Sequence, residues 1–168
     1  MALKMIKVCT ETFDQSQPSS IDTYLKLGGY SAWKKIINEQ IPKSEIIKTV
    51  KDAELKGKGG AGFLTGLKWS FIVPANTQKY LVCNSDESEP GTCKDRDLLR
   101  YNPHSIIEGM LITCYAIGAS IGYNYLRGEF IGDQWKVINL AIKDAYNAGL
   151  VGKNILSSGI SIDLIPLI

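Results

Sequence analysis

The stretch Tyr80–Leu126, YLVCNSDESEPGTCKDRDLLRYNPHSIIEGMLITCYAIGASIGYNYL, decides the fold class of this chain. It opens with a short apolar run, Tyr80–Cys83, which predicts a buried strand. A polar loop follows directly, over Ser85–Lys94. A strand that ends in a loop of this polarity is typical of an α/β protein, in which ligands bind beyond the carboxyl ends of the strands.

The second half of the stretch predicts a helix and a further strand. Asn102-Pro103 indicates a helix start, because proline is favoured at the first helical position, and Gly118 indicates its end. The apolar positions that make this helix largely buried are Ile106, Ile107, Met110, Leu111, Cys114 and Ile117. The alternating, tyrosine-rich segment Ile121–Leu126 then predicts a strand. Strand, helix and strand in this order favour a parallel sheet.

Upstream, the chain is predicted to be helical. Two short helices are expected at Asp22–Leu27 and Ser31–Asn38, separated by Gly28 and Gly29. A third helix is expected with Ser44 as its cap and Gly57 as its end. Its apolar positions are Ile46, Ile47, Val50 and Leu55.

Downstream, the alternation of helix and strand continues. Apolar residues recur at helical spacing from Trp135 to Ala145, and Gly149 predicts the stop. The segment Ile160–Ile168 begins like another strand. We therefore expect an α/β fold, with a helical N-terminal segment over residues 1–56 and an α/β domain with a mostly parallel sheet over residues 57–168.

Composition excludes several classes of protein. The chain has 168 residues, of which 45% are hydrophobic and 21% charged, so disordered, collagen-like and coiled-coil chains are excluded. The net charge of +2 is spread without a basic run, and nothing points to nucleic acid. The N-terminal sequence MALKMIKVCTETFD lacks the pattern of a signal peptide. The longest apolar region, Ile106–Tyr123, contains Glu108 and three glycines and predicts no membrane insertion.

The cysteines predict no metal site within the chain. None of the four forms a C-x-x-C pair or a zinc or iron–sulfur spacing, and we read them as reduced thiols. They are Cys9, Cys83, Cys93 and Cys114. The single histidine, His104, follows Pro103 at the predicted helix start, and a structural role in the first helical turn is favoured over a catalytic one.

A dense glycine loop, Gly57–Gly66, is the first candidate site. It holds five of the sixteen glycines and formally contains G-x-G-x-x-G. A helix precedes it where the dinucleotide fingerprint requires a strand, so the usual Rossmann motif is excluded, and the P-loop spacing is absent. Glycines still allow the backbone to approach a flat or phosphorylated ligand. Nearby Lys58 and Lys68 add positive charge and Phe63, Trp69 and Phe71 add rings, so a nucleotide site is favoured over a glycine-rich hinge.

The acidic loop, Asn84–Arg96, is the second candidate site. Asn84 and Asp86 could bind the polar edge of a ring or a ribose, and Glu87 and Glu89 could accept from ribose hydroxyls. A calcium or magnesium site and a glycosidase-like carboxylate pair rest on composition alone. A solvated turn that caps the following helix is the structural alternative.

Taken together, the two loops resemble the NADH-oxidising flavoprotein subunit of the NADH-quinone oxidoreductases of respiratory complex I. The matching segments are GKGGAGFLTGLKWSF (Gly57–Phe71), KYLVCNSDESEPGTCKDRDLLRYNPHSIIEGMLI (Lys79–Ile112), YLRGEF (Tyr125–Phe130) and AYNAGLVGKNILSSG, which ends at Gly159. The lead-in YLKLGGYSAWKK fits as well. The resemblance covers roughly residues 20–164.

The resemblance implies a Rossmann-like FMN-binding domain and hydride transfer from NADH to FMN, without a catalytic acid or base. The residues that correspond to FMN contacts are Gly57, Lys58, Gly59, Gly60, Lys68, Asn84, Asp86, Glu87 and Ser88. Those that correspond to NADH contacts are Gly60, Phe63, Phe71 and Glu89. Two positions depart from the family, which usually has arginine at Lys58 and proline at Leu64. Lysine keeps the charge but loses the bidentate fork.

The resemblance also implies an assembly. Electrons would pass through a [4Fe–4S] cluster and on to quinone, as in an electron-transport translocase, with a small [2Fe–2S] subunit and other peripheral-arm subunits as partners. The expected location is cytoplasmic and peripheral to the inner membrane, or the matrix side in a mitochondrion. Family members continue with further flavin-binding and cluster-bearing segments, so we expect a truncated copy with an incomplete FMN domain. The alternatives are a non-catalytic fragment or nucleotide-binding module, or the flavoprotein component of an NAD-linked hydrogenase or formate dehydrogenase.

Overall fold

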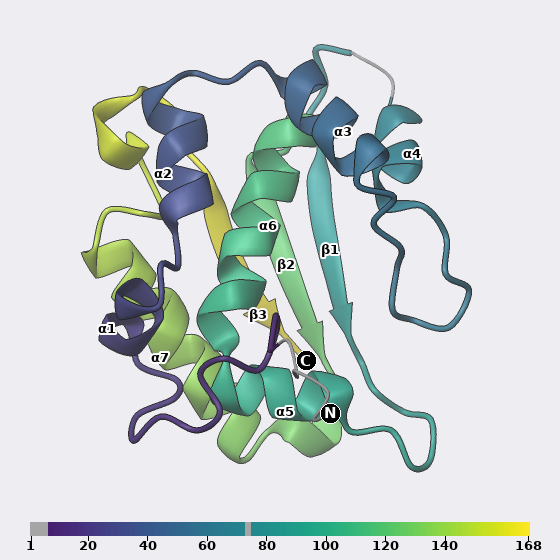
Figure 1. The fold of residues 1–168 in the computed structure, drawn as a ribbon, viewed down its shortest axis with the longest axis vertical. Helices are drawn as coiled ribbons and strands as arrows, with labels where there is room; N and C mark the ends of the chain where they lie inside the picture. Colours follow the sequence, from purple (N-terminus) through teal and green to yellow (C-terminus); the bar gives the residue numbers. More distant parts are fainter. Residues whose placement is uncertain (1–6, 73–74) are drawn as a thin grey trace, which may run out of the picture.

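The computed structural model describes residues 7–72 and 75–168, and the expectation about the first residues of the N-terminus lies partly outside this range. Within it, helices and strands follow one another as the sequence predicts, with a helical lead-in and then an α/β unit (Figure 1). The elements are α1 (Ile21–Lys26), α2 (Ser31–Asn38), α3 (Lys43–Asp52), α4 (Thr65–Ser70), β1 (Tyr80–Ser85), α5 (Lys94–Tyr101), α6 (Pro103–Ile117), β2 (Ile121–Leu126), η1 (Gly128–Phe130), α7 (Asp133–Asn147), η2 (Ile155–Ser157) and β3 (Asp163–Leu167).

The described strands form one parallel sheet in the order β1-β2-β3. Tyr80 pairs with Ile121 at the start of the first ladder, and Ser85 pairs with Leu126 at its end. Helices α5 and α6 connect β1 to β2, and α7 connects β2 to β3. The predicted parallel α/β fold is confirmed, and both loops that follow β1 and β2 leave from the same edge of the sheet.

One face of the sheet packs against helices and the other face is exposed. Leu126 and Leu164 are buried on the helix side. Gly122 lies so close to this layer that a Cβ would come within 2.8 Å of Leu164 and 3.2 Å of the Cys114 sulfur. On the opposite face Tyr80 and Val82 are exposed. The prediction of a buried first strand is therefore only half right, because β1 is an edge strand with one covered face.

Helix α6 packs against α1, α2 and α3 and against strands β1 and β2, and its Glu108 carboxylate binds the start of α2. Tyr30 precedes α2 in a left-handed conformation, and no side chain of its own caps the helix. Glu108 of α6 instead accepts hydrogen bonds from the Tyr30 and Trp33 backbone N–H groups, at 2.8 and 3.1 Å, and from the Tyr24 hydroxyl at 2.6 Å. A buried carboxylate at this place satisfies the free N–H groups of the helix terminus.

His104 has the structural role that the sequence favoured. It lies in the first turn of α6 with 1% of its surface exposed, and its Nδ1 is 2.9 Å from the Tyr30 hydroxyl. Burial lowers the pKa of His104 to about 4, so the ring is neutral at physiological pH.

Both ends of helix α3 differ from prediction, and α1 is shifted by one residue. Helix α3 begins at Lys43 with Pro42 at the N-cap, so Ser44 lies inside the first turn, and it ends at Asp52 instead of reaching Gly57. Proline fixes φ near the helical value and starts the helix without a side-chain cap. Helices α4 and α5 were not expected from the sequence, because they are short, with six and eight residues.

No helix within residues 7–72 and 75–168 has the length and apolar character that crossing a bilayer requires.

Candidate nucleotide-binding site

The glycine loop projects from a closed base. Lys56 and Leu64 form an antiparallel bridge, and the Gly57 N–H donates to the Phe63 carbonyl at 2.9 Å. Between these residues Gly60 has φ +115° and Gly62 has φ +63°, a region that L side chains rarely adopt. Residues 57–63 therefore form a loop whose turning requires glycine.

The end of this loop is fixed by a close contact between two helices. Gly66 lies in the first turn of α4, and a Cβ at this position would be 2.5 Å from the Lys51 backbone nitrogen of α3. Only glycine allows the two backbones to approach this closely. The last glycine of the cluster thus has a packing role, whereas Gly59 and Gly60 face open space.

The acidic loop begins where β1 ends, at the carboxyl edge of the sheet. The Asp86 N–H donates to the Asn84 side-chain oxygen at 3.0 Å, which turns the chain directly after the strand. The Glu87 carboxylate accepts from the backbone N–H groups of Asp95 and Arg96, both at 3.0 Å. Glu87 therefore caps α5, a helix that the sequence did not predict, whereas the structural alternative for this loop expected a turn that caps the helix beginning at Pro103.

The environment of Glu87 favours its ionised form. Burial leaves 7% of the residue exposed and by itself raises the carboxyl pKa, but the hydrogen bonds from Asp95 and Arg96 outweigh burial. The pKa of Glu87 lies below its usual value as a result. Because both carboxylate oxygens of Glu87 already accept from the backbone, the role of this side chain is to shape the loop. The neighbouring residues Asp86, Ser88 and Glu89 line a cavity beside it.

The two loops line one polar cavity of about 590 Å³. The glycine loop contributes three residues and the acidic loop the rest, although the loops are more than twenty residues apart in the chain. The lining residues are Lys58, Gly59, Gly60, Asn84, Asp86, Glu87, Ser88, Glu89, Thr92, Lys94 and Asp95. This volume lies in the range of cofactor sites, roughly 300–1,000 Å³.

A second, more apolar cavity of about 480 Å³ adjoins the first along the edge strand β1. Gly59 lines both cavities. The apolar cavity is lined by Gly57, Gly59, Ala61, Gly62, Phe63, Thr65, Lys68, Trp69, Ile72, Tyr80, Leu81, Val82, Thr113 and Ile117. A ligand with a polar part and a flat apolar part would find both environments around one glycine.

Phe63 and Phe71 form an exposed aromatic pair beside the apolar cavity. Their ring centroids are 6.2 Å apart with the planes inclined by 55°, and the residues are 49% and 62% exposed. Exposed rings at this spacing offer faces on which a planar group can stack. The pair links the end of the glycine loop to the end of α4.

The structure brings the predicted site residues together. Eight residues predicted to contact FMN or NADH line the polar cavity, and three more, Gly57, Phe63 and Lys68, line the apolar cavity. Phe71 lines neither cavity but contacts Phe63. Sequence reasoning missed Thr92, Lys94 and Asp95 as lining residues, although they belong to the same loop. It also missed the apolar wall that β1 and α6 form. The available signal was the pair of alternate apolar residues of the strand, Tyr80 and Val82.

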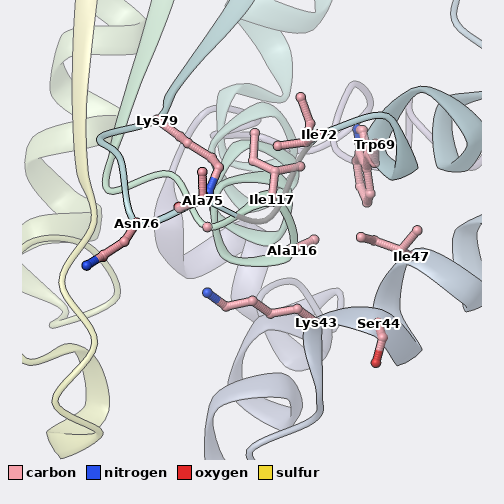
Figure 2. A pocket seen from close by; sticks show the side chains of 11 residues that line it. Lys43, Ser44, Ile47, Trp69, Ile72, Ala75, Asn76, Lys79, Ala116 and Ile117 are labelled. Carbon is pink, nitrogen blue, oxygen red and sulfur yellow. Dashed lines mark hydrogen bonds between the residues drawn. The ribbon is translucent and has the colours of Figure 1, made fainter.

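A third cleft, of about 510 Å³, lies at the opposite ends of the strands (Figure 2). It contains none of the residues predicted to contact FMN or NADH, although Trp69, Ile72 and Ile117 line both this cleft and the apolar cavity. Lys43 and Lys79 extend to the end of α6, where their ammonium nitrogens lie 3.4 and 3.8 Å from the place of a Gly118 Cβ. Cations are favoured at a helix C-terminus, which carries partial negative charge. The two lysines are thereby explained without a ligand.

The cysteines are free among the residues that the structure describes. Burial raises the pKa of Cys114 to about 12 and also raises that of Cys83, so both are protonated thiols at neutral pH. Residues 7–72 and 75–168 contain no group of three or more His, Cys, Asp or Glu side chains placed to hold a metal ion.

Most of the chain matches a known protein family. Residues 50–166 match the family described as the Nuo51 FMN-binding domain. The chain belongs to this family. The matched range contains both loops and the parallel sheet of this Nuo51 domain, except for the end of β3. The family resemblance inferred from the two loops is therefore confirmed.

Relatives of this Nuo51 domain include longer proteins. An NADH-quinone oxidoreductase subunit of Rickettsia bellii is 49% identical over 88% of this chain and 35% of the relative, and that of Aquifex aeolicus is 48% identical over 86% and 33%. The corresponding protein of Escherichia coli is 47% identical over 90% and 34%. The chain spans about a third of the length of the curated relatives it matches.

Solved structures share the fold. The NAD⁺-reducing [NiFe]-hydrogenase in its air-oxidised state matches with a TM-score of 0.62 and 34% identity, over 74% of this chain and 20% of that chain. Its H₂-reduced state matches with a TM-score of 0.64 and 28% identity, over 91% and 24%. The Nuo51 domain described above therefore has an α/β architecture that is also present in NAD-linked enzymes.

Proposed function

We propose that this chain binds FMN in the polar cavity between the two loops and forms the NADH-oxidising part of the flavoprotein subunit of an NADH-quinone oxidoreductase. The observation that carries the proposal is the shared cavity, in which Gly59 and Gly60 face open space opposite Asn84 and Asp86. Absent Cβ atoms let a flat ligand approach the backbone, and the side-chain oxygens and lysines offer acceptors and charge.

The donor set fits FMN. Lys58 supplies a cation for a phosphate within the polar cavity, beside Lys94, which pairs with Asp95, and Lys68 supplies another from the adjoining apolar cavity. Asn84, Asp86 and Ser88 supply polar groups for a ring or a ribityl chain. Gly57, Gly59 and Gly60 supply the backbone surface. We assign Glu87 an indirect part, because its carboxylate is engaged by α5.

NADH is proposed to bind on the apolar side of the same site. Phe63 and Phe71 offer ring faces for the adenine, while Gly60 and Glu89 line the polar cavity. FMN, when bound, supplies the ring that accepts hydride from NADH. The chain's own residues bind and align the two molecules, and none of them needs to act as an acid, base or nucleophile.

The partners and location follow from kinship with the NADH-quinone oxidoreductase subunits. We propose that the protein works with other peripheral subunits, a small [2Fe–2S] subunit among them, and that electrons continue through iron–sulfur clusters, including a [4Fe–4S] cluster, to quinone. The proposed location is peripheral to the inner membrane on its cytoplasmic or matrix side. The division into residues 1–56 and 57–168 also stays a prediction.

A second candidate function is that of a flavoprotein component in an NAD-linked hydrogenase, because two matching solved structures are of an NAD⁺-reducing [NiFe]-hydrogenase. The curated relatives named as NADH-quinone oxidoreductase subunits have higher identity and favour the quinone-linked function. The test is direct. The purified 168-residue chain is titrated with FMN and then assayed for NADH oxidation with ferricyanide as acceptor. Saturable FMN binding supports the proposal, and a chain that retains no flavin absorbance after excess FMN is removed contradicts it.

A further inference from the structure

Arg127 follows β2 directly and reaches across to the acidic loop. Parallel pairing places Leu126 of β2 beside Ser85 of β1, so the residues after these two strands leave the sheet side by side. The Arg127 guanidinium donates to the backbone carbonyl of Glu87 at 2.8 Å and to the Glu129 carboxylate at 2.7 Å. The side chain is 31% exposed.

The same residue of the loop is also held from the opposite direction. The Glu87 side chain accepts from the N–H groups of Asp95 and Arg96 at the start of α5. Arg127 holds the backbone of Glu87 and α5 holds its side chain. Asp86, Ser88 and Glu89 flank this fixed point and line the polar cavity.

The contact with the carbonyl distinguishes Arg127 from an ordinary surface ion pair. An exposed pair such as Arg127–Glu129 contributes little by itself. A planar guanidinium can however bridge a carbonyl and a carboxylate at once, which a lysine ammonium cannot do with the same geometry. Glu129 therefore orients Arg127, and Arg127 orients the loop.

The charges around the loop agree with this arrangement. The carboxylates of Asp86, Glu87, Glu89 and Asp95 gather at one cavity, opposed by Lys58 and Lys94 from within it. Arg127 adds a cation behind the loop, and both Glu129 and Asp86 contribute to raising its pKa. A cation at this position reduces the repulsion that would otherwise spread the loop.

We propose that Arg127 is a positioning residue for the flavin site, which sets the place of Asp86 and Ser88 by holding the Glu87 carbonyl. The inference rests on the proposed function for its ligand, but the contact itself belongs to the chain alone. Arg127 does not line either cavity, so any effect of its substitution on FMN is indirect.

The test compares Arg127→Ala, Arg127→Lys and Glu129→Gln with Arg100→Ala, a matched control in α5 whose guanidinium pairs with Asp133. Hydrogen exchange of the Asp95 and Arg96 amides reports the loop without flavin, and flavin fluorescence reports the FMN dissociation constant. We expect Arg127→Ala to speed exchange at both amides and to raise the FMN dissociation constant about tenfold. Arg127→Lys should give an intermediate effect on both, Glu129→Gln a smaller one, and Arg100→Ala no change.

Unchanged amide exchange and unchanged FMN affinity in Arg127→Ala would overturn the inference, as would equal effects of Arg100→Ala. If the wild-type chain binds no FMN, the proposed function fails, while amide exchange still decides whether Arg127 positions the loop. If Arg127→Ala does not fold, the same two readouts on Arg127→Lys decide, and wild-type values there overturn the inference.

Discussion

The rings of Phe63 and Phe71 contact one another at a centroid distance of 6.2 Å, inclined by 55°. A planar base sandwiched between two rings requires the rings to be roughly parallel and far enough apart to admit it. The exposed pair therefore has to open and at least one ring has to rotate before an adenine can stack between its members.

This pair predicts a separation of NADH binding from FMN binding. Phe71→Ala removes a stacking face outside the polar cavity, so the NADH dissociation constant should rise about tenfold with FMN affinity unchanged. Leu140→Ala, which removes an exposed apolar side chain from α7, is the control. Titration of each variant with NADH and with FMN checks the prediction. Equal loss of both ligands would show that Phe71 supports the fold instead.

Glu87 predicts a stability effect on α5. Glu87→Gln keeps one acceptor but removes the charge at the helix N-terminus, and we expect a loss of about 1 kcal/mol in urea unfolding at pH 7. Because the folded pKa of Glu87 is lowered, its contribution is complete above pH 4.5 and is lost as the pH falls through that lower pKa. Glu89→Gln is the control, since Glu89 is exposed. A stability loss in Glu89→Gln equal to that in Glu87→Gln would refute the capping role.

His104 predicts acid sensitivity over a defined window. The pKa of His104 is about 4 in the folded protein and about 6.5 in the unfolded chain. Below pH 6.5 the unfolded chain binds the proton first, so the free energy of unfolding is highest above pH 6.5 and falls as the pH drops toward 4. The loss amounts to about 3 kcal/mol across this window, at 1.36 kcal/mol per pH unit. His104→Gln should lack this part of the pH dependence. The measurement is urea unfolding at half-unit pH steps, and parallel curves for the two proteins would contradict the account.

Gly66 predicts that the glycine loop depends on close helix packing. Gly66→Ala would place a Cβ 2.5 Å from the Lys51 nitrogen and force α3 and α4 apart, at a cost of about 1–3 kcal/mol. Gly109→Ala is the matched control, because its Cβ meets nothing within 4 Å in the middle of α6 and alanine favours a helix. In thermal unfolding, Gly66→Ala should have a lower midpoint than the wild type, and Gly109→Ala should not. A midpoint for Gly66→Ala as high as that for Gly109→Ala would rule out the packing role.

Much of the fold was predictable because the signals are local. Pro103 and Gly118 mark the start and end of α6 through backbone geometry, and the tyrosine-rich alternation of β2 reflects a strand with one covered face. Helix α5 carries no such signal. Its N-terminus is capped by Glu87 from seven residues before the helix begins, a tertiary contact that periodicity does not contain.

The residues of the site were predictable from the sequence, but the separate role of each residue was not. Motif resemblance grouped Glu87 with Asp86 and Ser88, yet hydrogen bonding assigns the Glu87 side chain to α5. In the same way the glycine cluster reads as one loop, whereas Gly66 serves packing and Gly59 faces the cavities. The sequence alone indicates no role for Arg127, because its contact with the acidic loop depends on the parallel pairing of β1 and β2.

The most direct measurement is an FMN titration of the wild-type chain beside Gly59→Ala, Gly60→Val and Gly109→Ala. A Cβ at Gly59 meets nothing within 4 Å, so the methyl group of an alanine there clashes with no protein atom and fills space at the two cavities, while Gly60 at φ +115° has a backbone conformation that L side chains rarely adopt. The account predicts saturable FMN binding by the wild type and by Gly109→Ala, weakened binding by Gly59→Ala and none by Gly60→Val. Wild-type affinity in both loop variants, or no binding by the wild type in excess FMN, would contradict it.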